Sequence, residues 1–334
     1  MRVLMYSDRP SNRESFETAN ALLGDQKHDF TYTDARFTAD TARLADGHDG
    51  VCLFVNDQAD ADALRVLANR NVRIVALRSA GFNHVDVRAA HQLGLCVCRV
   101  PAYSPHAVAE HTLALILSLN RRIPRAWLRV RDNNFSLEGL LGFDMNGKTA
   151  GVVGTGKIGA LVAKLLAAFG CEVLVSDPYE NPALRGVATY VSIDEIFARS
   201  DIVTLHCPLT PTSKHLVNHA AVRRMKPGVM LVNTSRGGLV DTNAVIDGLK
   251  NRHIGYLALD VYEEEEGLFF EDLSGEIVED DRFARLTTFP NVIVTAHQAY
   301  FTRTALRNIA ETTLDNLTAF EQKGECRNAV LAHD

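Results

Sequence analysis

Two side chains suited to the chemistry of small carboxylic acids follow apolar stretches in the second half of the chain. Arg236 comes directly after PGVMLVNTS and is followed by two glycines, and His297 comes directly after VIVTA. An arginine guanidinium can bind a small carboxylate through two parallel hydrogen bonds, and a histidine can give and take a proton near neutral pH. Between them, ALDVYEEEEGLFFED supplies acidic residues, one of which could orient the imidazole and raise its pKa. These residues together indicate a site that binds a carboxylate and transfers a proton beside it.

Each of these residues also has a structural interpretation. Arg236 alone could form a surface salt bridge, the acidic run alone could be a solvated loop, and His297 alone could be structural. Their shared position after strands of one expected sheet favours the functional interpretation, because ligands of open α/β sheets bind beyond the carboxyl ends of the strands. The same rule identifies further candidate site residues at strand ends: Cys207 with Pro208, Thr234 with Ser235, and the segment 260–265.

The stretch from Thr149 to Gly159, TAGVVGTGKIG, has the pattern of a buried strand that passes through a glycine turn into a helix. In such a unit the first glycine permits a tight turn, the second lets the backbone approach a pyrophosphate, and the third lets helix and strand pack closely. These roles would fall to Gly154, Gly156 and Gly159, with free N–H groups at the helix start facing the anion. Asp177 ends the next expected strand, where a carboxylate can bind ribose hydroxyls and would repel a 2′-phosphate. The predicted cofactor is therefore NAD rather than NADP, and an ordinary βα turn is the alternative.

Short apolar strands alternate with helical patterns along most of the chain. The first hundred residues contain the expected strands RVLMYS, FTYTDA, GVCLF, RIVALRS and LCVCRV, and the alternation resumes from about Ala150 to Val294. Strands separated by helices predict parallel sheets with helices on both faces, so we expect two α/β domains. Because the first has no glycine-rich phosphate loop, we expect it to hold the substrate.

Between these regions, PAYSPHAVAEHTLALILSLNRR predicts a long helix that is apolar nearly all round. Such a helix is buried either in one core or between subunits, so we expect a homo-oligomer, either a dimer or a tetramer. His106 and His111 on this helix are interpreted as packing or hinge residues rather than ligands.

Composition restricts the classes of partner. The chain has 334 residues, 46% of them hydrophobic, and a net charge of -6 with acids and bases interspersed, which favours neither nucleic acid nor a membrane surface. No apolar run is long enough to span a bilayer and no signal peptide is visible, so a cytoplasmic location is expected.

The six cysteines lack a C-x-x-C pair and are predicted to be free thiols in a reducing compartment: Cys52, Cys96, Cys98, Cys171, Cys207 and Cys326. Only Cys96-x-Cys98 could begin a metal site, and we expect no metal.

Several motifs, spread over essentially the whole chain, resemble those of the D-isomer-specific 2-hydroxyacid dehydrogenases. They are RSAGFNHVD, VPAYSPHAVAEH, GTGKIG, LHCPLT, NTSRGGLVD, ALDVYEEE and TAHQAYFT. Within that family the chain is most similar to the fermentative D-lactate dehydrogenases. The resemblance implies an NAD-dependent enzyme that reversibly reduces pyruvate to D-lactate by hydride transfer.

The resemblance also implies roles for individual residues. Arg236 would orient the substrate, His297 would donate the proton, and Glu265 would pair with that histidine unless a neighbouring glutamate takes its place. The residues implied to contact the substrate are Ser79, Ala80, Gly81, Tyr103, Arg236 and Tyr300. Those predicted or implied to contact the cofactor are Gly154, Gly156, Lys157, Ile158, Gly159, Asp177, Cys207, Pro208, Thr234, Ser235 and Asp260. Phe269 and Phe270, in a longer segment after the acidic run, are left without a role beyond packing at the edge of a cleft.

The implied fold consists of two Rossmann-like, doubly wound parallel-sheet domains. A flavodoxin-like substrate domain would comprise residues 1–100 and 300–334, and a Rossmann NAD-binding domain would comprise residues 101–299, with the active site in the cleft between them. The last helix, from about Thr304 to Gln322, would return to the first domain. The alternatives left open are a dehydrogenase for a larger 2-oxo acid, a phosphoglycerate dehydrogenase and a non-catalytic NADH-sensing protein of the corepressor type.

Overall fold

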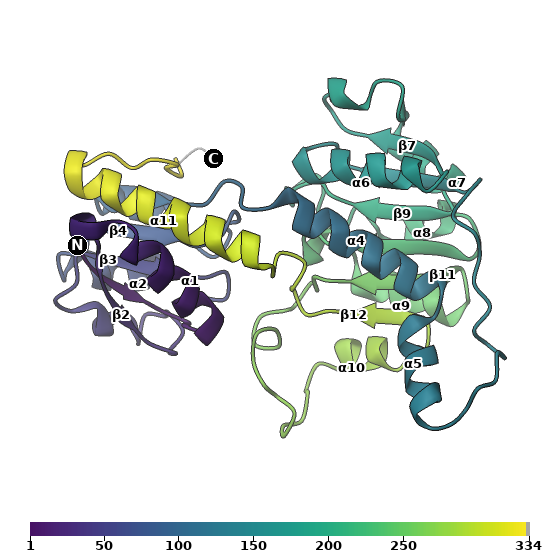
Figure 1. Ribbon diagram of the computed structural model, residues 1–334, viewed down its shortest axis with the longest axis horizontal. Helices are drawn as coiled ribbons and strands as arrows, with labels where there is room; N and C mark the ends of the chain where they lie inside the picture. The colour runs from purple at the N-terminus through teal and green to yellow at the C-terminus, as the bar shows by residue number, and fades with distance from the viewer. Residues whose placement is uncertain (332–334) are drawn as a thin grey trace. The chain divides into compact units, whose positions relative to one another are not determined.

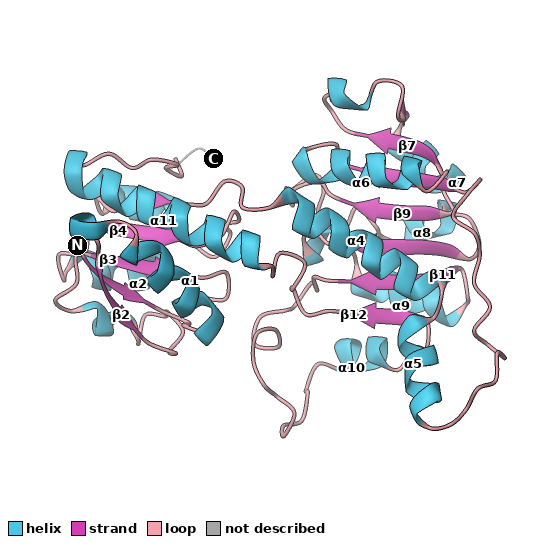
Figure 2. Cartoon of the chain, viewed as in Figure 1, coloured by secondary structure: helices cyan, strands magenta, loops and turns pink. Residues whose placement is uncertain are grey.

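The computed structural model describes residues 1–331, and the chain forms two compact units (Figures 1 and 2). Unit 1 consists of Met1–Ser104 together with the chain from Phe301 onward, and unit 2 is Pro105–Tyr300. Each unit is built around its own parallel β-sheet, as the alternation of strands and helices predicts.

Unit 1 contains a five-stranded sheet in the order β2-β1-β3-β4-β5, and all neighbouring strands are parallel. The strands are β1 (Arg2–Met5), β2 (Asp29–Tyr32), β3 (Gly50–Leu53), β4 (Ile74–Leu77) and β5 (Cys96–Cys98). The helices are α1 (Pro10–Ala21), α2 (Ala61–Ala68), α3 (Val87–Gln92) and α11 (Arg303–Lys323). Every residue of β3 and β4 is buried, because helices cover both faces of the sheet. The strand order is that of the flavodoxin-like fold, as predicted.

The C-terminal part of the chain is bound to unit 1 at several points. Helix α11 packs along α1, and the Met1 ammonium lies 2.6 Å from Glu321 Oε1. Beyond α11, the Val330 amide donates to the Val97 carbonyl at 2.9 Å.

A disulfide joins Cys96 in β5 to Cys326 after α11, with the two Cα atoms 6.3 Å apart. The prediction that all six cysteines are free thiols is therefore wrong for this pair. The other four are free, with Cys52, Cys98 and Cys171 buried and Cys207 partly buried. The two bonded cysteines are 230 residues apart in sequence, so only the folded chain brings them together.

Unit 2 contains a seven-stranded sheet in the order β12-β11-β10-β9-β6-β7-β8. The strands are β6 (Thr149–Val153), β7 (Glu172–Ser176), β8 (Thr189–Tyr190), β9 (Ile202–Leu205), β10 (Val229–Asn233), β11 (Ile254–Leu259) and β12 (Val292–Val294). The helices are α4 (Pro105–Asn120), α5 (Ile123–Arg131), α6 (Lys157–Ala168), α7 (Ile193–Arg199), α8 (His219–Arg224), α9 (Thr242–Lys250) and α10 (Asp281–Thr287). This is the doubly wound Rossmann order with one added strand. The strand order reverses between β6 and β9, and such a switch point is where ligands of these sheets bind.

Local sequence explains where several of these helices begin. Ser192 and Glu195 form a reciprocal capping box at the start of α7, and Asp241 accepts two backbone N–H bonds at the start of α9. Helix α4 begins with Pro105 and buries most of its side chains against α6 and strands β10 and β11. Its apolar surface is thus buried within unit 2, which removes the reason for assigning α4 to a subunit interface.

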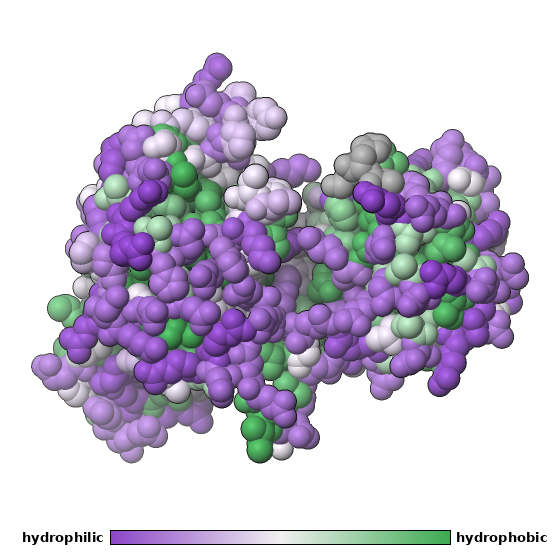
Figure 3. Space-filling view, turned by 180° about the vertical axis from the view of Figure 1, so that it is seen from behind, coloured by the Kyte–Doolittle hydropathy of each residue, from purple (hydrophilic) through white to green (hydrophobic). Residues whose placement is uncertain are grey.

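Helices α5 and α10 and the short strand β8 are elements that the sequence analysis did not place. Helix α5 and the segment after it expose large apolar side chains: Ile123, Trp127, Leu128, Val130, Phe135, Leu137 and Leu141. The face of the molecule seen in Figure 3 is largely polar, with separate apolar areas. None of the helices in the described part of the chain is both long enough and apolar enough to cross a membrane.

Candidate active site

A histidine–carboxylate pair lies beyond the carboxyl ends of β11 and β12. His297 Nδ1 is 2.9 Å from Glu265 Oε1, and the imidazole and the carboxylate are both largely buried. A carboxylate accepting from Nδ1 fixes the tautomer in which Nδ1 carries a proton, and it stabilises the imidazolium. Nε2 is then the nitrogen from which a proton can pass to another molecule.

Two neighbouring glutamates of the loop have other partners. Glu263 Oε1 pairs with His215 Nε2 at 2.5 Å, and Glu264 forms an ion pair with Arg282. Burial opposes ionisation of Glu263, but hydrogen bonds from His215 and Thr242 outweigh it and hold the pKa of Glu263 below its usual value. Glu265 is the acid placed against His297, and its catalytic role stays a prediction.

Asp260 holds the turn that carries His297. Its Oδ1 accepts from Thr295 Oγ1 at 2.7 Å and from the Gln298 amide at 2.9 Å, and its Oδ2 accepts from the Ala299 amide at 3.0 Å. Its carbonyl also accepts from the His297 amide at 2.5 Å. Burial alone would raise the pKa of Asp260, but hydrogen bonds to its carboxylate from His111, Thr295 and the Ala299 amide lower it. Asp260, predicted to contact the cofactor, is thus hydrogen-bonded to the turn that carries His297.

Arg236 follows β10 at the same edge of the sheet. Its guanidinium is partly buried, donates to the Ser235 carbonyl at 2.7 Å, and forms no ion pair with any carboxylate in residues 1–331. A guanidinium without an internal counter-ion remains able to bind an anionic ligand. A Cβ on Gly237 would lie 1.9 Å from the Tyr262 carbonyl oxygen. The glycine after Arg236 therefore lets the acidic loop approach the end of β10 closely.

Phe269 and Phe270 have separate roles. Phe269 is 4% exposed and packs in the core of unit 2 beside Tyr262 and Phe283. The Phe270 ring lies 5.6 Å from the His297 ring, centroid to centroid. The first residue is thus structural, and the second forms part of the surroundings of the imidazole.

The glycine turn after β6 has the geometry that a dinucleotide requires. Gly154 has φ +93°, and a Cβ there would lie 2.6 Å from the Cys207 amide nitrogen. A Cβ on Gly159 would lie 1.9 Å from the Gly154 carbonyl oxygen, so the helix and the turn can touch only through glycine. Gly156 is the N-cap of α6, lacks a side-chain cap, and has nothing within 4 Å of where a Cβ would stand. Open space before uncapped N–H groups is what a pyrophosphate needs, so these residues fit NAD.

The other predicted cofactor residues surround this turn or connect its neighbours. Asp177 Oδ2 accepts from the Thr155 amide at 2.7 Å, which places it at the turn, and Lys157 and Ile158 begin α6. Ser235 Oγ donates to the Cys207 carbonyl at 2.8 Å and so ties the ends of β9 and β10 together.

The side chains of Cys207 and Pro208 carry no charge near neutral pH. Burial raises the pKa of Cys207 to about 11, so its thiol is not a nucleophile near neutral pH. Pro208 beside it is exposed.

Sequence reasoning missed His206, which lies under the glycine turn. Its backbone carbonyl lies 2.8 Å from where a Gly154 Cβ would stand, and its Nε2 is 2.9 Å from Thr204 Oγ1. Burial lowers the pKa of His206 to about 3, so the imidazole is neutral at working pH. Its place in LHCPLT, directly before Cys207, was the available signal.

The remaining predicted substrate residues divide between the units. Tyr300 ends unit 2, three residues after His297, whereas Ser79, Ala80, Gly81 and Tyr103 belong to unit 1. The Ser79 hydroxyl donates to the Gly81 carbonyl at 2.7 Å, and Arg99 Nη1 donates to the Ala80 carbonyl at 3.0 Å, which fixes this turn after β4. The Tyr103 carbonyl accepts from Asn308 of α11 at 2.6 Å.

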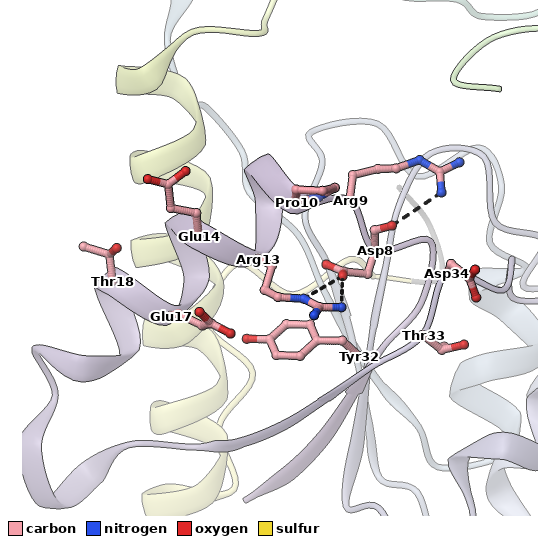
Figure 4. A pocket seen from close by; sticks show the side chains of 10 residues that line it. All are labelled: Asp8, Arg9, Pro10, Arg13, Glu14, Glu17, Thr18, Tyr32, Thr33 and Asp34. Atoms are coloured by element: carbon pink, nitrogen blue, oxygen red, sulfur yellow. Dashed lines mark hydrogen bonds and ion pairs between the residues drawn. The ribbon is translucent and has the colours of Figure 1, made fainter. Parts of the chain in front are cut away.

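Unit 1 also has a polar pocket between α1 and the ends of β1 and β2 (Figure 4). Inside it, Arg13 Nε and Nη2 donate to Asp8 Oδ2, and the Arg13 guanidinium lies 4.6 Å from the centre of the Tyr32 ring. Burial and the nearby acids raise the pKa of Tyr32 to about 12. None of the predicted site residues lines this pocket, so it is separate from the candidate active site.

No group of three or more potential metal ligands occurs within the described residues 1–331. Cys96, half of the only metal motif in the sequence, is bonded to Cys326 instead.

Known proteins resemble this chain over nearly its whole length. Residues 113–299 match the family model described as D-isomer specific 2-hydroxyacid dehydrogenase, NAD binding domain. The chain is 48% identical over 332 residues to D-lactate dehydrogenase of Escherichia coli, which covers 99% of this chain and 100% of that protein. It is 50% identical over 332 residues to a 2-hydroxyacid dehydrogenase homolog of Haemophilus influenzae, covering 99% of each. The solved structure of the pyruvate reductase of Chlamydomonas reinhardtii is similar with a TM-score of 0.92 at 43% identity, covering 98% of each chain. The chain therefore belongs to the D-isomer specific 2-hydroxyacid dehydrogenases and is an NAD-dependent member of that family.

Proposed function

We propose that this protein is a D-lactate dehydrogenase that reduces pyruvate to D-lactate with NADH and also runs in reverse. The observation that carries the proposal is the His297–Glu265 pair at 2.9 Å, on the same sheet edge as Arg236, whose guanidinium forms no ion pair within residues 1–331. A proton donor and a carboxylate-binding group beside a dinucleotide turn are what reduction of a 2-oxo acid requires. The similarity to D-lactate dehydrogenase of Escherichia coli supports pyruvate as the substrate.

In the proposed mechanism, Arg236 binds the substrate carboxylate through its guanidinium fork and directs the C2 carbonyl toward His297. NADH, when bound, supplies the hydride that adds to C2. His297 gives its Nε2 proton to the carbonyl oxygen as that bond is reduced, and Glu265 stabilises the imidazolium before the transfer. Solvent then returns one proton to the imidazole, so pyruvate, NADH and one proton become D-lactate and NAD.

Residues of unit 1 are proposed to complete substrate binding. The turn Ser79-Ala80-Gly81 would offer backbone N–H groups to the carboxylate, and the Tyr103 phenol would donate to the same group. Tyr300 would line the side of the substrate methyl. The fixed geometry of the 79–81 turn, held by Arg99, supports this assignment.

The test follows NADH oxidation with pyruvate, 2-oxobutyrate, 2-oxoisocaproate, phenylpyruvate and 3-phosphohydroxypyruvate, and then NAD reduction with D- and L-lactate. We expect the highest kcat/KM with pyruvate and activity with D-lactate only. One extra methylene in an apolar pocket changes binding by about 1–3 kcal/mol, so a larger 2-oxo acid as best substrate would correct the substrate and keep the chemistry. Binding of NADH without turnover on any acid would favour the NADH-sensing alternative.

We also propose that the protein forms a homo-oligomer through α5 and the segment after it, because large apolar side chains gather there. Trp127 is 58% exposed and Leu137 is 82% exposed, and an apolar patch of this kind is typical of a protein interface. Sedimentation of the native chain and of Trp127→Glu with Leu137→Glu tests this, with a smaller species expected for the double variant. We also propose a cytoplasmic location, which the four free thiols fit, whereas a disulfide such as Cys96–Cys326 is uncommon there.

A further inference from the structure

The turn that carries His297 has a backbone conformation that must be imposed by its surroundings. Ala296 has φ 49° and His297 has φ 59°, so two consecutive residues with side chains occupy the left-handed region. Such conformations cost of order 1–3 kcal/mol each and persist only where neighbouring groups fix them. Asp260 supplies four of the fixing hydrogen bonds, one through its backbone carbonyl to the His297 amide and three through its carboxylate to the residues on either side of His297.

His111, from α4, contacts this carboxylate and its partner. His111 Nε2 is 3.1 Å from Thr295 Oγ1 and 3.4 Å from Asp260 Oδ1. The Thr295 hydroxyl has one proton, which it donates to Asp260 Oδ1 at 2.7 Å. Toward His111 the hydroxyl can only accept, so Nε2 of His111 must carry a proton and donate it.

The helix that presents His111 is firmly held. The next residue, Thr112, is fully buried, donates to the Val108 carbonyl at 2.8 Å, and lies 2.9 Å from Thr234 Oγ1. Thr234 is two residues before Arg236. Two consecutive residues of α4 thus touch the strand end that leads to the arginine and the one that leads to the histidine.

We propose that His111 is a positioning residue for His297: by donating from Nε2 to Thr295 it locks the Thr295–Asp260 unit that fixes the catalytic turn. The inference rests on the proposed role of His297 as proton donor. It replaces the interpretation of His111 as a simple packing or hinge residue. His111 does not touch the reacting atoms in this scheme and acts only through Asp260.

The experiment compares His111→Leu with His111→Gln, because a glutamine amide can place an N–H where Nε2 of histidine stands. A misplaced catalytic group can lower the rate by about 10–100-fold, so we expect that loss of kcat in His111→Leu. KM for pyruvate should stay within about twofold, because Arg236 is untouched. His111→Gln should recover most of kcat. The matched control is His106→Gln, an exposed histidine on the same helix, which should behave as wild type.

Thr295→Val provides a second route that keeps the side-chain shape and removes only the hydroxyl. It should lower kcat as much as His111→Leu does. The double variant His111→Leu with Thr295→Val should have a kcat no lower than that of the worse single variant, because both substitutions break the same hydrogen bond. Additive losses, or equal losses in His111→Leu and His111→Gln, would overturn the proposal. A rise in KM without a fall in kcat would do the same.

Amide hydrogen exchange separates this inference from the proposed function. The Gln298 and Ala299 amides donate to Asp260, so their exchange should be faster in His111→Leu and unchanged in His111→Gln. If wild type turns over no 2-oxo acid, the proposed function is wrong, and the exchange rates still decide whether His111 fixes the turn. Unchanged exchange in His111→Leu would refute the positioning role.

Discussion

At the scale of single residues, His297 is the proposed proton donor. Replacing it by alanine should lower kcat by about 10²–10⁴-fold, the usual contribution of an acid–base residue. NADH affinity, measured by fluorescence titration, should be unchanged, because the glycine turn lies after another strand. Turnover close to wild type would show that another group donates the proton.

Arg236 should affect substrate binding more than the chemical step. In Arg236→Lys a single ammonium replaces a fork, and a lost hydrogen bond to a charged group costs about 1.5–3 kcal/mol. We expect KM for pyruvate to rise by about tenfold or more, with a smaller change in kcat. The control is Arg282→Lys, an arginine of the same unit that pairs with Glu264. An equal effect of both substitutions would contradict the assignment.

The ionised carboxylate of Asp260 should make the free energy of unfolding decrease at acid pH. Its pKa is lowered in the folded state, so its contribution is complete above the unfolded value of about 3.9 and is lost as the pH falls through the lower folded value. Asp260→Asn removes an acceptor that buried N–H groups need, at a cost of about 1–3 kcal/mol. In urea unfolding, the difference in stability between the two proteins should be largest near neutrality and should shrink once the pH falls below the unfolded value. A difference that grows on acidification would refute this.

At the scale of elements, two substitutions in the turn between β6 and α6 should distinguish a residue needed for cofactor binding from one needed for the fold. A Cβ on Gly156 meets nothing within 4 Å, whereas one on Gly159 would lie 1.9 Å from the Gly154 carbonyl oxygen. We expect Gly156→Ala to keep the melting temperature and weaken NADH binding, because its methyl group occupies the space for the pyrophosphate. Gly159→Ala should lower both the melting temperature and NADH affinity, since backbone must move.

The control for this pair is Gly275→Ala, which also has no atom within 4 Å and lies far along the chain from the turn. It should change neither property. Normal NADH binding by Gly156→Ala would show that the pyrophosphate does not approach this glycine.

At the scale of the whole molecule, the disulfide connects the edge strand of unit 1 to the C-terminal segment. A bond closing a long loop typically stabilises by about 2–4 kcal/mol, chiefly by restricting the unfolded chain. Cys326→Ser should lower the free energy of unfolding by this amount in urea titrations without reductant. Dithiothreitol should bring wild type to the same value and leave the variant unchanged. Equal stability of oxidised wild type and variant would contradict a stabilising bond.

The sequence by itself determined the local units of this protein. Alternating strands and helices predicted two parallel sheets, and the spacing of Gly154, Gly156, Gly159 and Asp177 predicted the dinucleotide turn, because these patterns are set by neighbouring residues. The motifs around Arg236 and His297 predicted the family. Helix α5 was not predicted, although Ile123, Trp127 and Val130 recur at helical spacing, and in the structure these apolar side chains are exposed.

Only the tertiary structure decided which distant groups meet. It selected Glu265 among four adjacent glutamates, joined Cys96 to Cys326, and placed His111 of α4 against Thr295 and Asp260. It also showed that Gly237 is required by the Tyr262 carbonyl and that α4 is buried within unit 2. These contacts join residues from separate strands and helices. The distances between their side chains are set by how the sheets and helices pack, so residue spacing within one segment does not predict them.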